Sequence, residues 1–145
     1  MRDILEDPAR TGVVIVTTGE EMPVVETIEL AERLQPETGC HLAAVVANRV
    51  LPEPLARLDE AVFARLGLVK SRRALAARVG PGAGAVLDAT TLAAGLRRRQ
   101  AAHFTTLAAA LGDSAPVLFL PERFDRTGGL AATQRVADAL AEELE

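Results

Sequence analysis

Short apolar runs that end at polar or proline residues recur along this chain. The clearest is Leu42–Pro52, LAAVVANRVLP, whose apolar part stops at Asn48 and Arg49. A run of this kind is typical of a strand buried on both faces, as in a parallel sheet covered by helices. Gly12–Thr18 and Pro116–Leu120 have the same character, so the sequence predicts an α/β fold with three fully buried strands.

Between the strands, apolar residues recur every three or four positions, which predicts amphipathic helices. The first helix begins near Pro23 and ends near Pro36 and Gly39. Its apolar stripe consists of Val24, Ile28, Ala31 and Leu34. A last helix follows Gly129, with one face formed by Val136, Leu140 and Leu144. Gly12–Asn48 is therefore a βαβ unit, whose crossover is expected to be right-handed.

The longest connection between predicted strands, residues 53–112, is helical and exceeds what a crossover needs. One helix carries the stripe Leu55, Leu58, Val62 and Leu66. A second covers Arg72–Val79 and ends at the GPGAG sequence of Gly80–Gly84, and a third covers Ala85–Leu111. This helical insertion is either additional core or a lid or partner-binding subdomain within a single domain of residues 1–145.

Length and composition are those of one soluble globular domain of 145 residues. Apolar residues make up 49% of the chain and charged residues 25%, which argues against disordered and membrane classes. No apolar run is long enough to span a bilayer, and the charged N-terminus is unlike a signal peptide, so the cytoplasm is the expected compartment. The net charge of -4 gives no case for nucleic-acid binding.

The polar ends of the predicted strands are where a ligand is expected, because open parallel sheets bind ligands at the carboxyl ends of their strands. If the strands are parallel, these ends form one rim with Thr17, Thr18, Glu20, Asn48, Arg49, Pro121 and Arg123. Asn48 offers both an amide donor and a carbonyl acceptor, which suits the edge of a nucleobase. The alternative is that Asn48 only closes a turn.

Several motifs of catalytic and metal sites are missing. The sequence contains no GxxxxGK[ST], the loop whose backbone N–H groups and lysine surround a phosphate. His41 and His103 have no partner at metal-ligand spacing, and Cys40 alone cannot form a multi-cysteine zinc site. No serine or cysteine lies in a recognisable nucleophile elbow, so no catalytic residue is predicted.

Three strands are few for a sheet covered on both faces, because the outer strands carry unpaired backbone edges. We expect the sheet to be completed by strands outside this chain, either from a longer parent protein or from another chain. A homo- or hetero-oligomer would then form through the sheet edge or through the helical insertion.

An ordered set of motifs resembles one known family. It consists of LxDPxxT from Leu5, VVIVTTGEEMPVVET from Val13, VVANRVLPE from Val45 and FLPERFDRTGGL from Phe119. This order is similar to the C-terminal half of the arsenical pump-driving ATPases (ArsA-like, anion-transporting ATPases). That family includes the targeting ATPases for tail-anchored membrane proteins.

The resemblance implies a P-loop NTPase-like, three-layer fold with a deviant Walker A loop, in which this chain holds the adenosine side of an ATP or ADP site. By position in the motifs, Glu20 matches the acid that approaches the nucleotide, and Asn48 matches the residue that reads the adenine edge. The loop from Pro121 to about Gly128 matches the segment around the base and ribose. The candidate nucleotide-binding residues are Glu20, Asn48, Arg49, Pro121, Glu122 and Arg123.

Departures from the family limit what is expected. Gly19 stands where relatives often have proline or a polar residue, which would loosen the approach to Glu20. The CxxC zinc motif of the targeting ATPases is absent, so no zinc is expected. Without a phosphate loop the chain alone is not expected to hydrolyse ATP, and magnesium would bind only in the complete protein, with the missing half or a partner subunit. The alternative function is a non-catalytic helical module that binds a partner subunit or an apolar segment.

Overall fold

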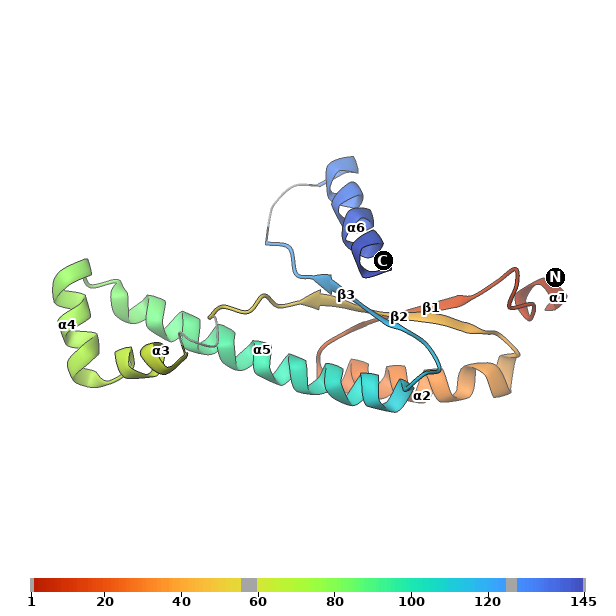
Figure 1. Cartoon of the computed structure of the whole chain (residues 1–145), viewed down its shortest axis with the longest axis horizontal. Helices are drawn as coiled ribbons and strands as arrows, with labels where there is room; N and C mark the ends of the chain where they lie inside the picture. The colour runs from red at the N-terminus through yellow and green to blue at the C-terminus, as the bar shows by residue number, and fades with distance from the viewer. Residues whose placement is uncertain (1, 56–59, 125–127, 145) are drawn as a thin grey trace. The chain divides into compact units, whose positions relative to one another are not determined.

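The computed structural model describes residues 2–55, 60–124 and 128–144 (Figure 1). These residues form three strands and six helices. In chain order the elements are α1 Arg2–Leu5, β1 Val13–Thr18, α2 Glu21–Thr38, β2 Leu42–Val50, α3 Glu60–Leu66, α4 Val69–Val79, α5 Ala83–Leu111, β3 Val117–Pro121 and α6 Leu130–Glu143. The helix predicted around Leu58 is seen from Glu60 onward, and Leu58 itself lies outside the described residues.

The chain divides into two compact units. The first, called here the sheet unit, contains the chain up to Leu51 and from Arg99 onward. The second, the helical unit, is Pro52–Arg98. Helix α5 contributes its first part to the helical unit and its last part to the sheet unit.

The three strands of the sheet unit are parallel and lie in the order β1-β2-β3. Ile15 pairs with Val45, and Val45 pairs with Val117 on its other side. The predicted α/β class and the parallel sheet are confirmed, and the arrangement is consistent with a P-loop NTPase-like fold. Because all three strands run the same way, their carboxyl ends lie at one edge of the sheet.

Helices cover both faces of the sheet, which makes three layers (Figure 1). On one face, Val24 of α2 and Phe104, Leu107 and Leu111 of α5 pack against Ile15, Val45 and Ala47. On the other face, Ala139 and Leu140 of α6 pack against Ala44, Val46, Leu118 and Leu120. The central strand β2 is therefore buried on both sides, as its uninterrupted apolar run predicts.

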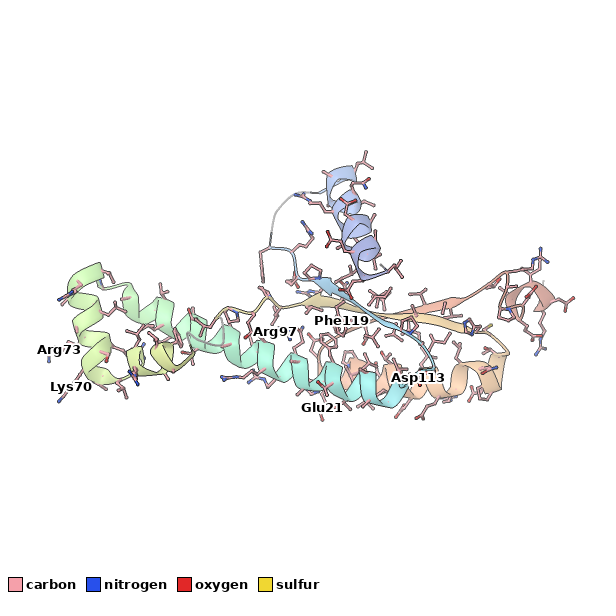
Figure 2. All side chains as sticks on the ribbon, in the orientation of Figure 1. Glu21, Lys70, Arg73, Arg97, Asp113 and Phe119 are labelled. Atoms are coloured by element: carbon pink, nitrogen blue, oxygen red, sulfur yellow. The ribbon has the colours of Figure 1, made fainter. Side chains whose placement is uncertain are left out.

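The prediction that all three strands are fully buried is wrong for β1 and β3. Val14 and Val16 of β1 are 52% and 63% exposed, because the packing of α6 reaches β2 and β3 but not β1. On β3, Phe119 (Figure 2) is 36% exposed. Its ring packs edge-on against Phe104, with ring centroids 5.7 Å apart. An apolar run shows that a strand prefers burial but not whether the chain itself supplies the cover.

The helix boundaries follow the predicted signals with small differences. Pro23 lies in the first turn of α2, and the helix continues through Pro36 to end before Gly39, which has a left-handed backbone (φ 76°). This is the conformation that glycine adopts at a helix end without a Cβ penalty. In α6, Leu140 packs on the sheet as predicted, whereas Leu144 lies beyond the helix and is 70% exposed. Among the described helices, none is both long and apolar enough to cross a bilayer.

Candidate functional site

A pocket opens at the carboxyl ends of β2 and β3, beside α6. Its volume is about 190 Å³. The lining residues are Asn48, Arg49, Leu120, Pro121, Glu122, Arg123, Val136 and Ala139. Two strand ends separated by more than 70 residues of sequence thus meet in one cavity, as the parallel sheet requires. All the predicted site residues except Glu20 line it.

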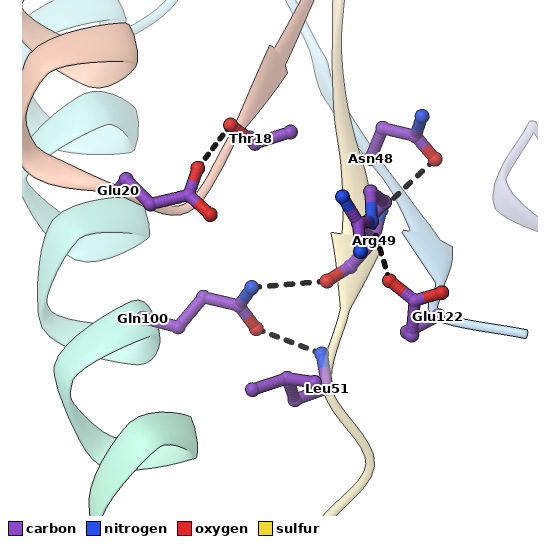
Figure 3. A network of polar contacts seen from close by, with 7 residues as sticks. All are labelled: Thr18, Glu20, Asn48, Arg49, Leu51, Gln100 and Glu122. Carbon is purple, nitrogen blue, oxygen red and sulfur yellow. Dashed lines mark hydrogen bonds and ion pairs between the residues drawn. The ribbon is translucent and has the colours of Figure 1, made fainter. Parts of the chain in front are cut away.

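A bulge in β2 turns Asn48 and Arg49 toward this pocket. Ala47 pairs with Phe119 and Val50 pairs with Pro121, so Asn48 and Arg49 together oppose the single residue between those partners on β3. Bulges of this kind redirect side chains and are frequent next to binding sites. Asn48 Oδ1 accepts a hydrogen bond from the Arg49 backbone N–H at 2.9 Å (Figure 3).

Arg49 has the only positive φ (58°) of any non-glycine residue in the described ranges. A left-handed backbone is unfavourable for a residue with a Cβ, so surrounding contacts must hold it. Arg49 Nε donates to Glu122 Oε2 at 2.6 Å, which ties the end of β2 to the residue after β3. The Arg49 side chain is 67% exposed, and that of Glu122 is 17% exposed.

The hydrogen bond and charge of Glu122 raise the pKa of the Arg49 guanidinium above its ordinary value, with a smaller contribution from the charge of Glu20. Arg49 therefore keeps its positive charge at any pH at which the protein folds. The pocket mouth consequently carries a permanent positive charge from Arg49.

We expect Arg49→Gly to be more stable than Arg49→Ala. Both variants lose the bond to Glu122, but only glycine adopts the positive φ without strain. The urea midpoint of Arg49→Gly should be roughly 0.5 M higher than that of Arg49→Ala. Equal midpoints would mean that this backbone is not strained in solution.

Glu20 lies apart from the pocket. Its carboxylate accepts a hydrogen bond from the Thr18 hydroxyl at the end of β1, and it is the residue before α2 (Figure 3). Buried Thr17 donates its hydroxyl to the Pro23 carbonyl at 3.2 Å and closes the same turn. Of the described rim, the structure thus brings together the ends of β2 and β3, whereas the end of β1 is a separate cluster.

Two contributions to the site were not predicted. Val136 and Ala139 of α6 form one wall of the pocket, and the helical spacing of α6 predicted only an inward face, not which strands it covers. Gln100 of α5 makes hydrogen bonds on both sides of Val50, to Arg49 and Leu51 (Figure 3). The signal in the sequence is that Gln100 is a polar residue on the apolar stripe of a helix. A buried amide needs hydrogen-bond partners, so such a residue points to a polar contact in the core.

Gly19 is explained by packing rather than by a looser approach to Glu20. A Cβ at this position would lie 2.1 Å from Gln100 Cγ and 2.7 Å from Phe104 Cζ. Both distances are far shorter than any van der Waals contact. Only glycine therefore fits between the end of β1 and helix α5.

Comparison with known proteins gives a family match for the first part of the chain. Residues 1–71 match the family described as anion-transporting ATPase (ArsA). These residues are similar to the ArsA-like family. No curated protein matches the chain. The matched stretch includes the bulge with Asn48 and Arg49, and ArsA-like ATPases bind and hydrolyse ATP, so a nucleotide is the ligand class that the family indicates.

The pocket combines apolar walls with the polar side chain of Asn48. Within residues 2–55, 60–124 and 128–144, no group of three or more histidine, cysteine, aspartate or glutamate side chains lies close enough together to hold a metal. The Asn48 side-chain NH₂ makes no hydrogen bond to any described residue, whereas its oxygen is engaged by Arg49. An unpaired amide donor at a cavity fits a ring-nitrogen acceptor.

Proposed function

We propose that this chain provides the base-binding side of an ATP or ADP site in an ArsA-like ATPase. The observation that carries the proposal is the pocket at the ends of β2 and β3, which gathers Asn48, Arg49, Pro121, Glu122 and Arg123. This is the edge of a parallel sheet at which α/β proteins bind ligands. In the complete protein, nucleotide binding is coupled to hydrolysis and to anion transport or protein targeting.

Asn48 is proposed to recognise the base. Its oxygen is held by the Arg49 N–H, which orients the amide and leaves the NH₂ as the group offered to a ligand. A ring nitrogen of adenine is an acceptor for this donor. Apolar walls from Leu120, Val136 and Ala139 suit the faces of an aromatic base.

The size of the pocket supports a partial site. Complete small-molecule sites usually occupy roughly 300–1,000 Å³, whereas this pocket measures about 190 Å³. The 145 residues also contain no GxxxxGK[ST] motif for the phosphates. We therefore propose that the phosphate loop and the magnesium ligands come from other residues of a complete protein or from a partner subunit.

The exposed side of β1 is the proposed junction with that partner. β1 lies at an edge of the sheet, and Val14 and Val16 present large apolar surfaces there. A groove of about 300 Å³ runs beside the strand, between Val16 and Leu30 of α2. A sheet edge beside a groove is a template for a further strand, and the proposed occupant is a strand of the phosphate-binding half.

Isothermal titration calorimetry of the chain with adenosine, ADP and ribose 5-phosphate tests the proposal. We expect adenosine and ADP to bind with similar affinity, with or without magnesium, and ribose 5-phosphate not to bind. Asn48→Ala should weaken adenosine binding about tenfold, because a buried hydrogen bond to the base is lost. Gln35→Ala, an exposed amide on α2, is the control and should bind as the unmodified chain does.

The second candidate function, a helical interaction module, is favoured by the surface of the helical unit. Val69, Val79 and Leu68 are 83%, 69% and 62% exposed. A groove of about 400 Å³ in the same unit is lined by Leu55, Phe63, Ala64, Gly67, Thr91, Ala94 and Arg98. If adenosine and ADP fail to bind even with the phosphate-binding half supplied in trans, this second function replaces the first.

A further inference from the structure

The end of β2 continues beyond the point where its neighbour β1 stops. Thr18 and Asn48 are the last pair between the two strands, and two residues later Glu20 already precedes helix α2. If β1 continued, its residue opposite Val50 would make two hydrogen bonds to β2. Its N–H would donate to the carbonyl of Arg49, and its carbonyl would accept from the N–H of Leu51. Without such a residue, the Arg49 carbonyl and the Leu51 N–H lack a partner from β1.

The side-chain amide of Gln100 takes the place of that missing residue. Gln100 Nε2 donates to the Arg49 carbonyl at 3.0 Å, and Gln100 Oε1 accepts from the Leu51 N–H at 2.7 Å (Figure 3). The residue is only 8% exposed, so these bonds are largely shielded from water. One side chain thus reproduces both hydrogen bonds that a parallel strand would make to this stretch.

Three features of the surroundings accompany this arrangement. The absence of a Cβ at Gly19 leaves the space that the Gln100 side chain occupies. Gln100 bonds the carbonyl of Arg49, the residue with the positive φ, and Arg49 in turn bonds Glu122 across the pocket. Leu51 is the last residue of the sheet unit before the helical unit, so the bonds of Gln100 secure the chain at its exit.

We infer that Gln100 is a positioning residue for the nucleotide pocket, because its amide holds Arg49 in the backbone conformation that presents Asn48 and the Arg49–Glu122 pair to the ligand. The inference takes the identity of the ligand from the proposed function, whereas the effect of Gln100 on the geometry of β2 does not depend on that function. Gln100 itself does not line the pocket and does not contact the nucleotide. Its effect on binding is therefore indirect and passes through the end of β2.

Two substitutions test this inference. Gln100→Met keeps the length of the side chain and removes both hydrogen bonds. Gln100→Glu keeps the shape, but it can donate to the Arg49 carbonyl only when its carboxyl is protonated. Burial and the facing carbonyl should raise the pKa of this introduced glutamate, so the protonated form is present at the lower end of the accessible pH range and is lost as pH rises. Gln35→Met, at an exposed position of α2, is the matched control.

The readouts are backbone amide NMR signals of the full chain and its affinity for ADP. In Gln100→Met, we expect the amide signals of Asn48, Arg49, Leu51 and Glu122 to shift and ADP to bind about tenfold more weakly at every pH. In Gln100→Glu, signals and affinity should match the unmodified chain near about pH 5. Near about pH 8, the signals of Asn48, Arg49 and Glu122 and the affinity should move toward those of Gln100→Met, while the carboxylate still accepts from the Leu51 N–H. Measurements on the unmodified chain and on Gln100→Met at the same pH values correct for effects of pH that do not depend on position 100.

The outcomes separate this inference from the proposed function. If ADP does not bind the unmodified chain, the proposed function fails, and the amide signals alone decide whether Gln100 positions the strand end. Unchanged signals of Asn48, Arg49 and Glu122 in Gln100→Met, with unchanged affinity, would overturn the inference. If Gln100→Met does not fold, a Gln100→Glu variant that shows no recovery at low pH would overturn it as well.

Discussion

Gly19→Ala is expected to destabilise the chain by about 3 kcal/mol, at the upper end of overpacking substitutions. The new Cβ would lie 2.1 Å from Gln100 Cγ and 2.7 Å from Phe104 Cζ. Neither neighbour can easily move away, because the Gln100 amide is held by two hydrogen bonds and Phe104 is in the core. Urea unfolding followed by circular dichroism measures the loss as a lower midpoint with an unchanged slope.

Gly82→Ala is the matched control for this substitution. A Cβ at Gly82 meets no atom within 4 Å, and the residue does not have a positive φ. The free energy of unfolding should stay the same or rise by less than about 1 kcal/mol, because alanine reduces the freedom of the unfolded chain. If Gly19→Ala were as stable as Gly82→Ala, the close approach of β1 to α5 would be wrong.

Leu107→Ala is the second large effect that we expect. Leu107 is completely buried on α5 and packs with Ile15, Val24 and Val45, which come from two strands and a second helix. Removing its isobutyl group leaves a cavity at the centre of this layer, which costs about 3 kcal/mol in the free energy of unfolding. The same urea experiment measures the loss.

Leu130→Ala provides the comparison for Leu107. Leu130 is the first residue of α6 and is 84% exposed, so its replacement should change the free energy of unfolding by no more than about 0.5 kcal/mol. Similar losses at both positions would show that α5 does not form the core of the sheet unit. A loss at Leu107 alone confirms that this end of α5 is part of the core.

The sequence was sufficient to predict the strands and the place of the pocket. The uninterrupted apolar run before Asn48 predicted a strand buried on both faces, and β2 is such a strand at the centre of the sheet. Because parallel strands end at the same edge, the polar residues after β2 and β3 were expected together, and Asn48 and Pro121 line one pocket. These predictions needed only the direction of the strands and the positions of their ends.

Other features depended on contacts between distant parts of the chain. The exposure of Val14 and Val16 follows from where α6 packs, which the helical spacing of α6 does not specify. The positive φ of Arg49 depends on the bulge opposite β3 and on Gln100, which lies 51 residues away in the chain. From the sequence alone, Gly19 was expected to loosen the approach to Glu20. In the structure, glycine is required there because side chains of α5 occupy the space that a Cβ would need.

The most direct test of the account is a titration of adenosine into the isotopically labelled chain, followed by backbone amide NMR. The account predicts that the largest signal changes occur at the ends of β2 and β3 and on the facing side of α6. The pocket residues to follow are Asn48, Arg49, Glu122, Arg123, Val136 and Ala139. Changes confined to the groove beside β1 or to the helical unit, or no changes at saturating adenosine, would contradict it.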